Sequence, residues 1–146
     1  MRHELITFGI ANQRFGIDIM TVREIRAWSP VTRLPRVPDY VAGVVNLRGA
    51  VLPVIDLAAR LGWEPTEATP RNPIIVIEYE GQLRGLIVHE VADIVSIEAG
   101  SLQHPDALAQ EAITNFLEGI APLGDDMVMV LDLKRLMMDD PIELAA

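Results

Sequence analysis

The chain has 146 residues, of which half are hydrophobic and 23% are charged, and its formal net charge is −9. This composition is typical of one globular domain, or of two small halves that share a core, and not of a disordered chain. The acidic excess argues against a protein that binds nucleic acid or docks on anionic lipid, since such proteins use a basic surface. The chain contains no cysteine, which excludes disulfides and thiolate chemistry.

Two further features bear on where the protein works. No apolar stretch reaches the roughly 18 residues that a membrane-spanning helix needs. The first ten residues, MRHELITFGI, lack the long apolar run of a signal peptide. We therefore expect a cytoplasmic protein without direct membrane contact.

Short β-type runs dominate the first half. Residues 5–10 and 14–19 flank a three-residue connection and predict a hairpin. An alternating strand at 22–26 precedes an irregular loop that contains three prolines. Two apolar runs follow at 43–47 and 50–56, separated only by Arg48-Gly49. A single helical turn is expected at 58–61, ended by a glycine.

The pattern restarts after a proline-rich linker at 63–73. The later strands are expected at 74–79, 84–88, 94–97, 116–121 and 127–131. A short helix is expected within residues 100–115 and a helical turn at 133–137.

This restart is an internal repeat. GIDIMTVREI at 16–25 aligns with GLIVHEVADI at 85–94, and GVVNLRGAVLPVIDL at 43–57 aligns with GIAPLGDDMVMVLDL at 119–133. Each alignment keeps its register without a gap, and the two follow one another in the same order. The repeat therefore predicts two similar halves, at about 1–66 and 70–140, within a single domain over 1–146.

Each half holds about five short strands and almost no helix. Sheets this small must protect their edges, and curling into a barrel does so. Each half alone buries little apolar area, so the two must pack against each other. We predict an all-β fold of two tandem five-stranded barrels, with the exchange of strands between them left open.

Asp56 and Asp132 occupy equivalent places in the two halves, directly before a helical turn. An aspartate there accepts hydrogen bonds from the first free N–H groups of the turn. We expect both to be helix caps, in preference to catalytic acids.

The segment Asn46-Leu47-Arg48-Gly49 differs from its mate, Pro122-Leu123-Gly124-Asp125. The turn itself therefore does not require an arginine, and an asymmetry inside a repeat indicates what one copy does alone. An arginine at a groove edge can pair with a carboxylate while its stem packs on apolar side chains. Glu24 is the candidate carboxylate, and its mate Asp93 is also acidic.

The sequence gives no sign of a catalytic or cofactor site. The three histidines are dispersed, the acidic pairs lack the spacing of a cation loop, and nucleophile and phosphate-loop motifs are missing. No cofactor or metal and no enzymatic activity are expected. The alternative that stays open is a small β-barrel binding module for a metabolite or an oligonucleotide.

GVVNLRGAVLPVIDLAARLG resembles the signature of CheW, the chemotaxis coupling-protein family. The resemblance extends through FGIDIMTVREIRAWSPVTRLPRVPDYVAG, GLIVHEVADIVSI and LEGIAPLGDDMVMVLDL, and thus covers nearly the whole chain. It implies two SH3-like barrels in a stand-alone, non-enzymatic adaptor. Such an adaptor would link the cytoplasmic tip of methyl-accepting chemoreceptors to the regulatory domain of the chemotaxis histidine kinase, in arrays at the inner membrane.

The resemblance also implies two binding surfaces. The receptor tip is expected in the groove between the barrels, at Val22, Glu24, Gly43, Asn46, Leu47, Arg48 and Gly49. The kinase is expected on one face of the first barrel, at Ile19, Ala42 and Val51.

Overall fold

The computed structural model describes residues 2–66, 69, 71–104 and 112–137. The strands in the described residues are β1 (Arg2–Ile10), β2 (Gln13–Asp18), β3 (Val22–Arg26), β4 (Val41–Leu47), β5 (Ala50–Asp56), β6 (Ile74–Tyr79), β7 (Gln82–Ile87), β8 (Glu90–Glu98), β9 (Leu117–Leu123) and β10 (Asp126–Leu131). The α-helical turns are α1 (Leu57–Arg60) and α2 (Leu133–Leu136). Among the described residues there are also three short 3₁₀ turns, η1 (Ile19–Thr21), η2 (Ala99–Ser101) and η4 (Ala112–Phe116). The last two lie in the region where a short helix was expected, and residues 105–111 are outside the described residues.

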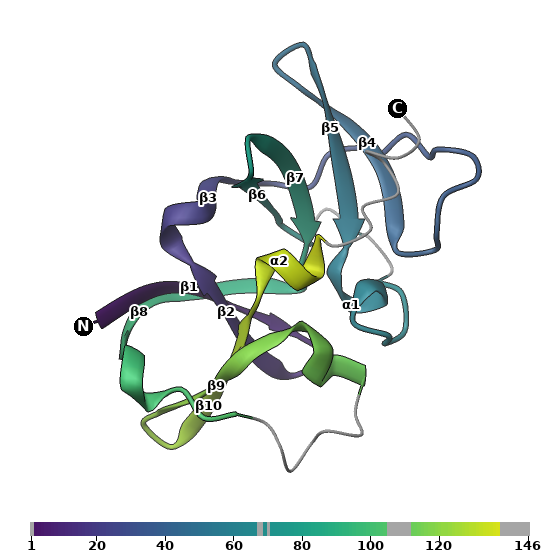
Figure 1. The fold of residues 1–146 in the computed structure, drawn as a ribbon. Helices are drawn as coiled ribbons and strands as arrows, with labels where there is room; N and C mark the ends of the chain where they lie inside the picture. The colour runs from purple at the N-terminus through teal and green to yellow at the C-terminus, as the bar shows by residue number, and fades with distance from the viewer. Residues whose placement is uncertain (1, 67–68, 70, 105–111, 138–146) are drawn as a thin grey trace.

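The strands form two five-stranded sheets, as predicted, and Figure 1 shows them one above the other. The first has the order β8-β1-β2-β10-β9, and the second has the order β3-β6-β7-β5-β4. Each sheet therefore takes strands from both halves of the sequence. The hairpin β1–β2 belongs with the last three strands, and the hairpin β6–β7 belongs with β3, β4 and β5.

The repeat explains this arrangement strand by strand. Shifting β1 and β2 by 69 residues superimposes them on β6 and β7, and shifting β4 and β5 by 76 residues superimposes them on β9 and β10. The two sheet orders then coincide, with β3 matching β8. The parallel pairing of Val54 with Gly85 in one sheet recurs as Val130 with Gly16 in the other. The molecule is thus two equivalent barrels that exchange their hairpins.

Three apolar clusters make up the core of the described residues. One cluster lies within the β3–β7 sheet and includes Ile74 and Val76, and a smaller one lies within the other sheet. The largest cluster takes residues from both sheets, including Phe15 of β2 and Ile75 and Ile77 of β6. Because alternate residues of β6 face different clusters, this strand is apolar on both faces. The core between the barrels is the shared core that the small halves were predicted to need.

Arg60 holds the two halves together where they meet. Its guanidinium carbon lies 4.6 Å from the ring centre of Tyr40 and 4.6 Å from that of Phe116, two rings that are mates in the repeat. Its Nε donates a hydrogen bond of 3.1 Å to the carbonyl of Leu136 in α2. A guanidinium between two rings is stabilised by both π faces, so Arg60 fixes α2 against the other half.

The two aspartates before the helical turns behave differently. Asp132 caps α2, accepting hydrogen bonds from the backbone N–H groups of Lys134 and Arg135. The same prediction for Asp56 is wrong, since its side chain makes no capping bond to α1. Its two oxygens instead accept bonds from the N–H and hydroxyl of Thr66, at 2.7 and 2.8 Å. The carboxylate of Asp56 therefore bonds to the linker and not to the first turn of α1.

His89 extends this contact toward the other sheet. Its Nε2 lies 3.1 Å from the Thr66 hydroxyl, and its Nδ1 accepts the N–H of Ala11 at 3.0 Å. Because Nδ1 accepts from a backbone N–H, the proton of the neutral ring lies on Nε2. The chain from Ala11 through His89 and Thr66 to Asp56 joins the β1–β2 turn, the linker and the end of β5.

Candidate functional site

The β4–β5 hairpin presents Arg48 at its tip. Leu47 pairs with Ala50, so Arg48 and Gly49 are the two central residues of the turn. Both have positive φ, 49° and 87°, as a type I′ turn requires. The side chain of Asn46 accepts the N–H of Gly49 at 2.8 Å, which fixes the turn. The sequence between the two apolar strands thus builds a tight, rigid projection.

Arg48 occupies a position that suits glycine better. Its mate in the repeat is Gly124, which has a φ of 61° in the equivalent β9–β10 turn. A residue with a Cβ atom in the left-handed region costs about 1–2 kcal/mol. Ala11 and Glu80 have a similar positive φ in the β1–β2 and β6–β7 turns, so hairpins of this fold tolerate the strain, and Gly124 avoids it. The asymmetry found in the sequence is therefore also an energetic asymmetry.

Glu24 receives Arg48 from across the same barrel. An Nη of Arg48 donates to Oε2 of Glu24 at 3.2 Å, and Arg26 forms an ion pair with Oε1 at 3.5 Å. Arg48 is 72% exposed and Glu24 29% exposed at their side chains, so the arginine lies at the surface above a half-buried carboxylate. An exposed ion pair contributes about 0–1 kcal/mol to stability. In the Glu24 cluster, defined here as Glu24, Arg26 and Arg48, the pair of Arg48 with Glu24 is thus no major source of fold stability.

The alternation along β3 explains the cluster. Val22, Glu24 and Arg26 share the half-buried face, whereas Arg23 and Ile25 are exposed on the other. Arg26 was not predicted as a site residue, although the two-residue period of a strand places it beside Glu24. On the exposed face, Arg23 forms an ion pair with Glu78 of β6.

The remaining residues predicted at the receptor groove lie around this cluster in different ways. Val22 is half-buried and packs on the core between the barrels. Leu47 and Gly43 are buried, so they shape the hairpin from beneath. A Cβ atom at Gly43 would lie 2.1 Å from the carbonyl oxygen of Thr32, because the loop before β4 returns across the strand there. The structure thus brings Glu24 and Arg48 together at the surface and places the others as their support.

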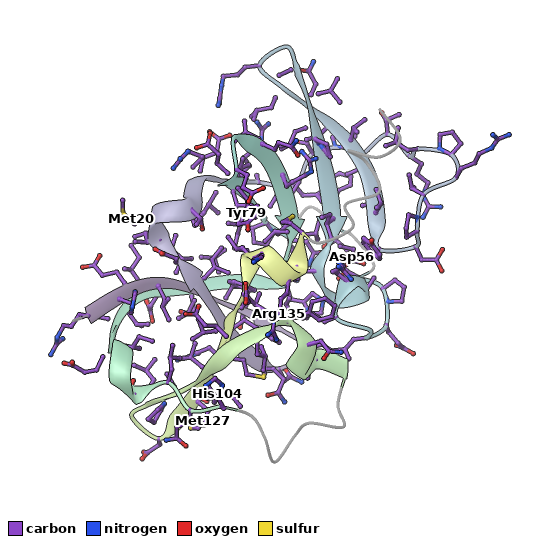
Figure 2. The ribbon with its side chains drawn as sticks, viewed as in Figure 1. Met20, Asp56, Tyr79, His104, Met127 and Arg135 are labelled. Carbon is purple, nitrogen blue, oxygen red and sulfur yellow. The ribbon has the colours of Figure 1, made fainter. Side chains whose placement is uncertain are left out.

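The three residues predicted to contact a kinase do not form one continuous patch. Val51, at the start of β5, is 74% exposed, and Ala42 on β4 is half-buried. Ile19 lies on η1 next to Met20, at the left of the molecule in Figure 2, whereas the β4–β5 hairpin lies at the upper right. Ala42 and Val51 share a hairpin, and Ile19 stands apart.

Outside the Glu24 cluster, one tyrosine has a perturbed pKa. Loss of solvent around its ring, followed by the nearby charges of Glu80 and Asp132, raises the pKa of Tyr79 above its ordinary value. Among the described residues, no group of three or more histidine, aspartate or glutamate side chains is arranged to hold a metal ion. Within the same residues, no helix is long and apolar enough to cross a bilayer.

The fold is a pair of SH3-like barrels that exchange hairpins, and comparisons with known proteins show the family to which it belongs. The CheW-like domain matches residues 4–140. A probable chemotaxis protein CheW of Rhizobium etli is 42% identical over 97% of this chain and 92% of its own length. The chemotaxis protein CheW of Rhizobium meliloti is 39% identical, again over 97% of this chain and 92% of its own length.

A solved structure agrees with these relatives. The crystal structure of the scaffolding protein TtCheW from Thermoanaerobacter tengcongensis has a TM-score of 0.83 and 34% identity, covering 94% of this chain and 88% of that one. The chain belongs to the CheW-like family.

Proposed function

We propose that this protein is a chemotaxis adaptor that couples chemoreceptors to the chemotaxis histidine kinase and catalyses no reaction itself. Family membership and the scaffolding relative support the adaptor role. They do not favour the alternative of a module for a metabolite or an oligonucleotide. We also propose three points beyond what these relatives support. They are the two specific partners, the absence of catalysis and recruitment to receptor arrays at the inner membrane.

The observation that carries the receptor site is the exposed arginine at the tip of the β4–β5 hairpin and its ion pair with Glu24. The residue is held in a left-handed turn that glycine adopts in the other barrel, and its ion pair with Glu24 returns little stability. Its guanidinium is mostly exposed, yet its direction is set by Glu24 below it. A preorganised cation of this kind can pair with a carboxylate of a partner without first losing its own freedom.

The receptor-binding groove would run beside this hairpin. Glu24 and Arg48 would contact the receptor tip, and Asn46 and Gly49 would hold the turn. Val22, Gly43 and Leu47 would support the surface from below. The kinase regulatory domain would meet the first barrel at Val51 and Ala42, with Ile19 at the edge of that contact.

Such an arrangement transmits a signal without chemistry. A receptor and a kinase held side by side on one rigid scaffold are coupled when the conformation of one changes the relative stability of the conformations of the other. The shared core between the barrels supplies the rigidity, since the two binding surfaces belong to one packed unit.

Co-sedimentation with receptor signalling fragments and the kinase regulatory domain tests the site. We expect Arg48→Glu to reduce the amount that sediments with receptor fragments at least about tenfold, because it places like charges beside Glu24 and removes the exposed cation. The matched control is Arg2→Glu, which removes an arginine that is 69% exposed from a surface ion pair with Glu98. The control should sediment as the wild type does. Equal sedimentation of both variants would remove Arg48 from the site.

A further inference from the structure

Two buried atoms of the Glu24 cluster have no hydrogen-bond partner within the part of the chain that the structure describes. They are Oε1 of Glu24, which can accept a hydrogen bond, and Nε of Arg26, which can donate one. Most buried polar atoms in proteins are hydrogen-bonded, because a buried group without a partner has lost its contact with water and gained nothing in return. The two atoms are complementary, so a movement that brought them together would satisfy both.

Strand β3 places Arg26 next to Glu24 on its half-buried face. The backbones of both residues are held in register against β6, where Glu24 pairs with Val76 and Arg26 pairs with Ile74. Nη1 of Arg26 lies 3.5 Å from Oε1 of Glu24, which is an ion pair without a hydrogen bond. The side chain of Arg26 is 25% exposed, against 72% for that of Arg48. Arg26 is therefore the inner cation of the cluster, and Arg48 is the outer one.

The outer cation sets the present direction of the carboxylate. Arg48 donates a hydrogen bond of 3.2 Å to Oε2 of Glu24. A guanidinium and a carboxylate pair most strongly side by side, with two N–H groups on the two oxygens. Arg26 cannot form that pair while Oε2 is bonded to Arg48, and it is left with Oε1 alone. The carboxylate thus lies between two arginines and is hydrogen-bonded to the outer one.

We propose that Arg26 is a positioning residue, which takes over the Glu24 carboxylate when Arg48 pairs with a carboxylate of the receptor. This inference rests on the proposed receptor site. In the exchange, Glu24 turns from Arg48 to Arg26, and its Oε1 and the Nε of Arg26 gain a hydrogen bond. The bond formed with Arg26 offsets the bond lost to Arg48, so the arginine at the hairpin tip can leave Glu24 at little cost in free energy.

The half-buried position of Glu24 explains why a second cation matters. Two carboxylates beside one guanidinium repel each other, so a receptor carboxylate at Arg48 would push Glu24 away. The side chain of Glu24 is 29% exposed, and a carboxylate that is largely removed from water is destabilising when it loses its counter-ion. Without Arg26, each receptor contact at Arg48 would leave such a carboxylate unpaired. With Arg26, Glu24 stays paired in both the free and the bound protein.

Nuclear magnetic resonance of the arginine side chains tests the exchange without a receptor. Arg48→Gln removes the outer cation, so the Nε–H group of Arg26 should form its hydrogen bond to Glu24. Its proton signal should move downfield, and its exchange with water should slow several-fold. Arg23, which forms its ion pair with Glu78 on the opposite face of β3, is the internal reference and should not change. An unchanged Arg26 signal would overturn the proposal.

A second variant shows whether Glu24 is the acceptor. Adding Glu24→Met to Arg48→Gln removes the carboxylate while keeping a side chain of similar length, and the downfield shift of Arg26 should disappear. A shift that persists would mean that Arg26 bonds to another group, which would also contradict the proposal.

Co-sedimentation with receptor signalling fragments tests the consequence for binding. Arg26→Met keeps most of the apolar stem and removes the inner cation, so the amount that sediments should fall at least about threefold. Arg26→Lys supplies another cation for Glu24 and should restore most of the binding, which a loss of packing alone would not explain. Arg14→Met is the matched control, since Arg14 is also partly exposed and forms an ion pair, with Asp126 in the other sheet. This control should sediment as the wild type does.

The outcomes separate this exchange from the receptor site itself. Normal sedimentation of Arg26→Met, or an equal loss with Arg26→Lys, would show that Arg26 does not position Glu24 for binding. If the wild type does not sediment with receptor fragments, the proposed receptor site is wrong. The resonance measurement then still decides whether Glu24 moves between the two arginines.

Discussion

Arg48 shows how one residue can differ between two copies of the same structure. Its turn and the turn at Gly124 both have a positive φ at the first central residue, and only the first carries a side chain there. The cost of the left-handed conformation, about 1–2 kcal/mol, is not returned by an exposed ion pair worth about 0–1 kcal/mol. Stability therefore does not explain the arginine, and the proposed contact with a receptor would give it a use.

Arg48→Gly separates the two roles. Glycine adopts the required φ without strain, so the free energy of unfolding should stay unchanged or rise by up to about 1 kcal/mol, despite the loss of the ion pair with Glu24. Urea denaturation followed by circular dichroism measures this, and sedimentation with receptor fragments should fall at the same time. A loss of stability clearly above 1 kcal/mol would mean that the arginine is structural.

Much at the residue scale could be predicted from the sequence, and the exceptions have physical causes. The pairing of Glu24 with Arg48 followed from comparing the two halves. The cap prediction held for Asp132 and failed for Asp56, because a hydroxyl ten residues away competes for the carboxylate. A sequence pattern shows which groups can form hydrogen bonds, but it does not show which of two possible donors pairs with a given carboxylate in the folded chain.

At the scale of elements, β4 contains a glycine that allows the loop before this strand to approach it closely. Gly43 has a φ of 142°, and the loop residue Thr32 bonds across it to Val44. Its mate Gly119 lies beside the equivalent bridge, where a Cβ atom would be 3.1 Å from the carbonyl oxygen of Gln103. The two positions look alike in the sequence and differ in how closely the loop approaches.

This difference predicts unequal effects of the same substitution. Gly43→Ala should lower the free energy of unfolding by about 3 kcal/mol or more, because the new methyl group meets backbone and the φ becomes strained. Gly119→Ala should cost about 1 kcal/mol, since a small shift relieves its contact. Urea denaturation of the two variants provides the comparison. Equal losses would show that the loop before β4 can move away freely.

The positions of the elements were largely evident from the alternation and the turn residues. The strands at 22–26 and 74–79 begin and end where predicted, and the others differ by a few residues at their ends. Their sheet partners beyond the local hairpins could not be read in this way. The exchange of the β1–β2 and β6–β7 hairpins depends on apolar faces that look the same whichever barrel they join.

At the scale of the whole molecule, that exchange makes the two barrels one unit. Phe15 of β2 is fully buried in the core between them, stacks with Phe8 at 6.0 Å between ring centres, and meets the edge of Trp63 at 5.7 Å. Neither barrel can lose its exchanged hairpin without opening the shared core. We therefore expect a single cooperative unfolding transition.

Phe15→Ala tests this expectation. The substitution should cost about 3–5 kcal/mol and lower the stability of both barrels together. In a Trp63→Phe background, the fluorescence of Trp28 reports on the other barrel, while circular dichroism reports on all strands. Both signals should shift to the same lower urea midpoint. A Trp28 transition that stays at its original midpoint would show that the barrels unfold separately.

The central claim is that the charged hairpin couples receptor and kinase, and kinase activity in reconstituted receptor arrays tests it most directly. Arrays would be assembled from receptor signalling fragments, the histidine kinase and either the wild type, Arg48→Glu or the control Arg2→Glu. The account predicts strong loss of kinase activation with Arg48→Glu, while the other two proteins activate the kinase equally. Full activation by a correctly folded Arg48→Glu variant would contradict it.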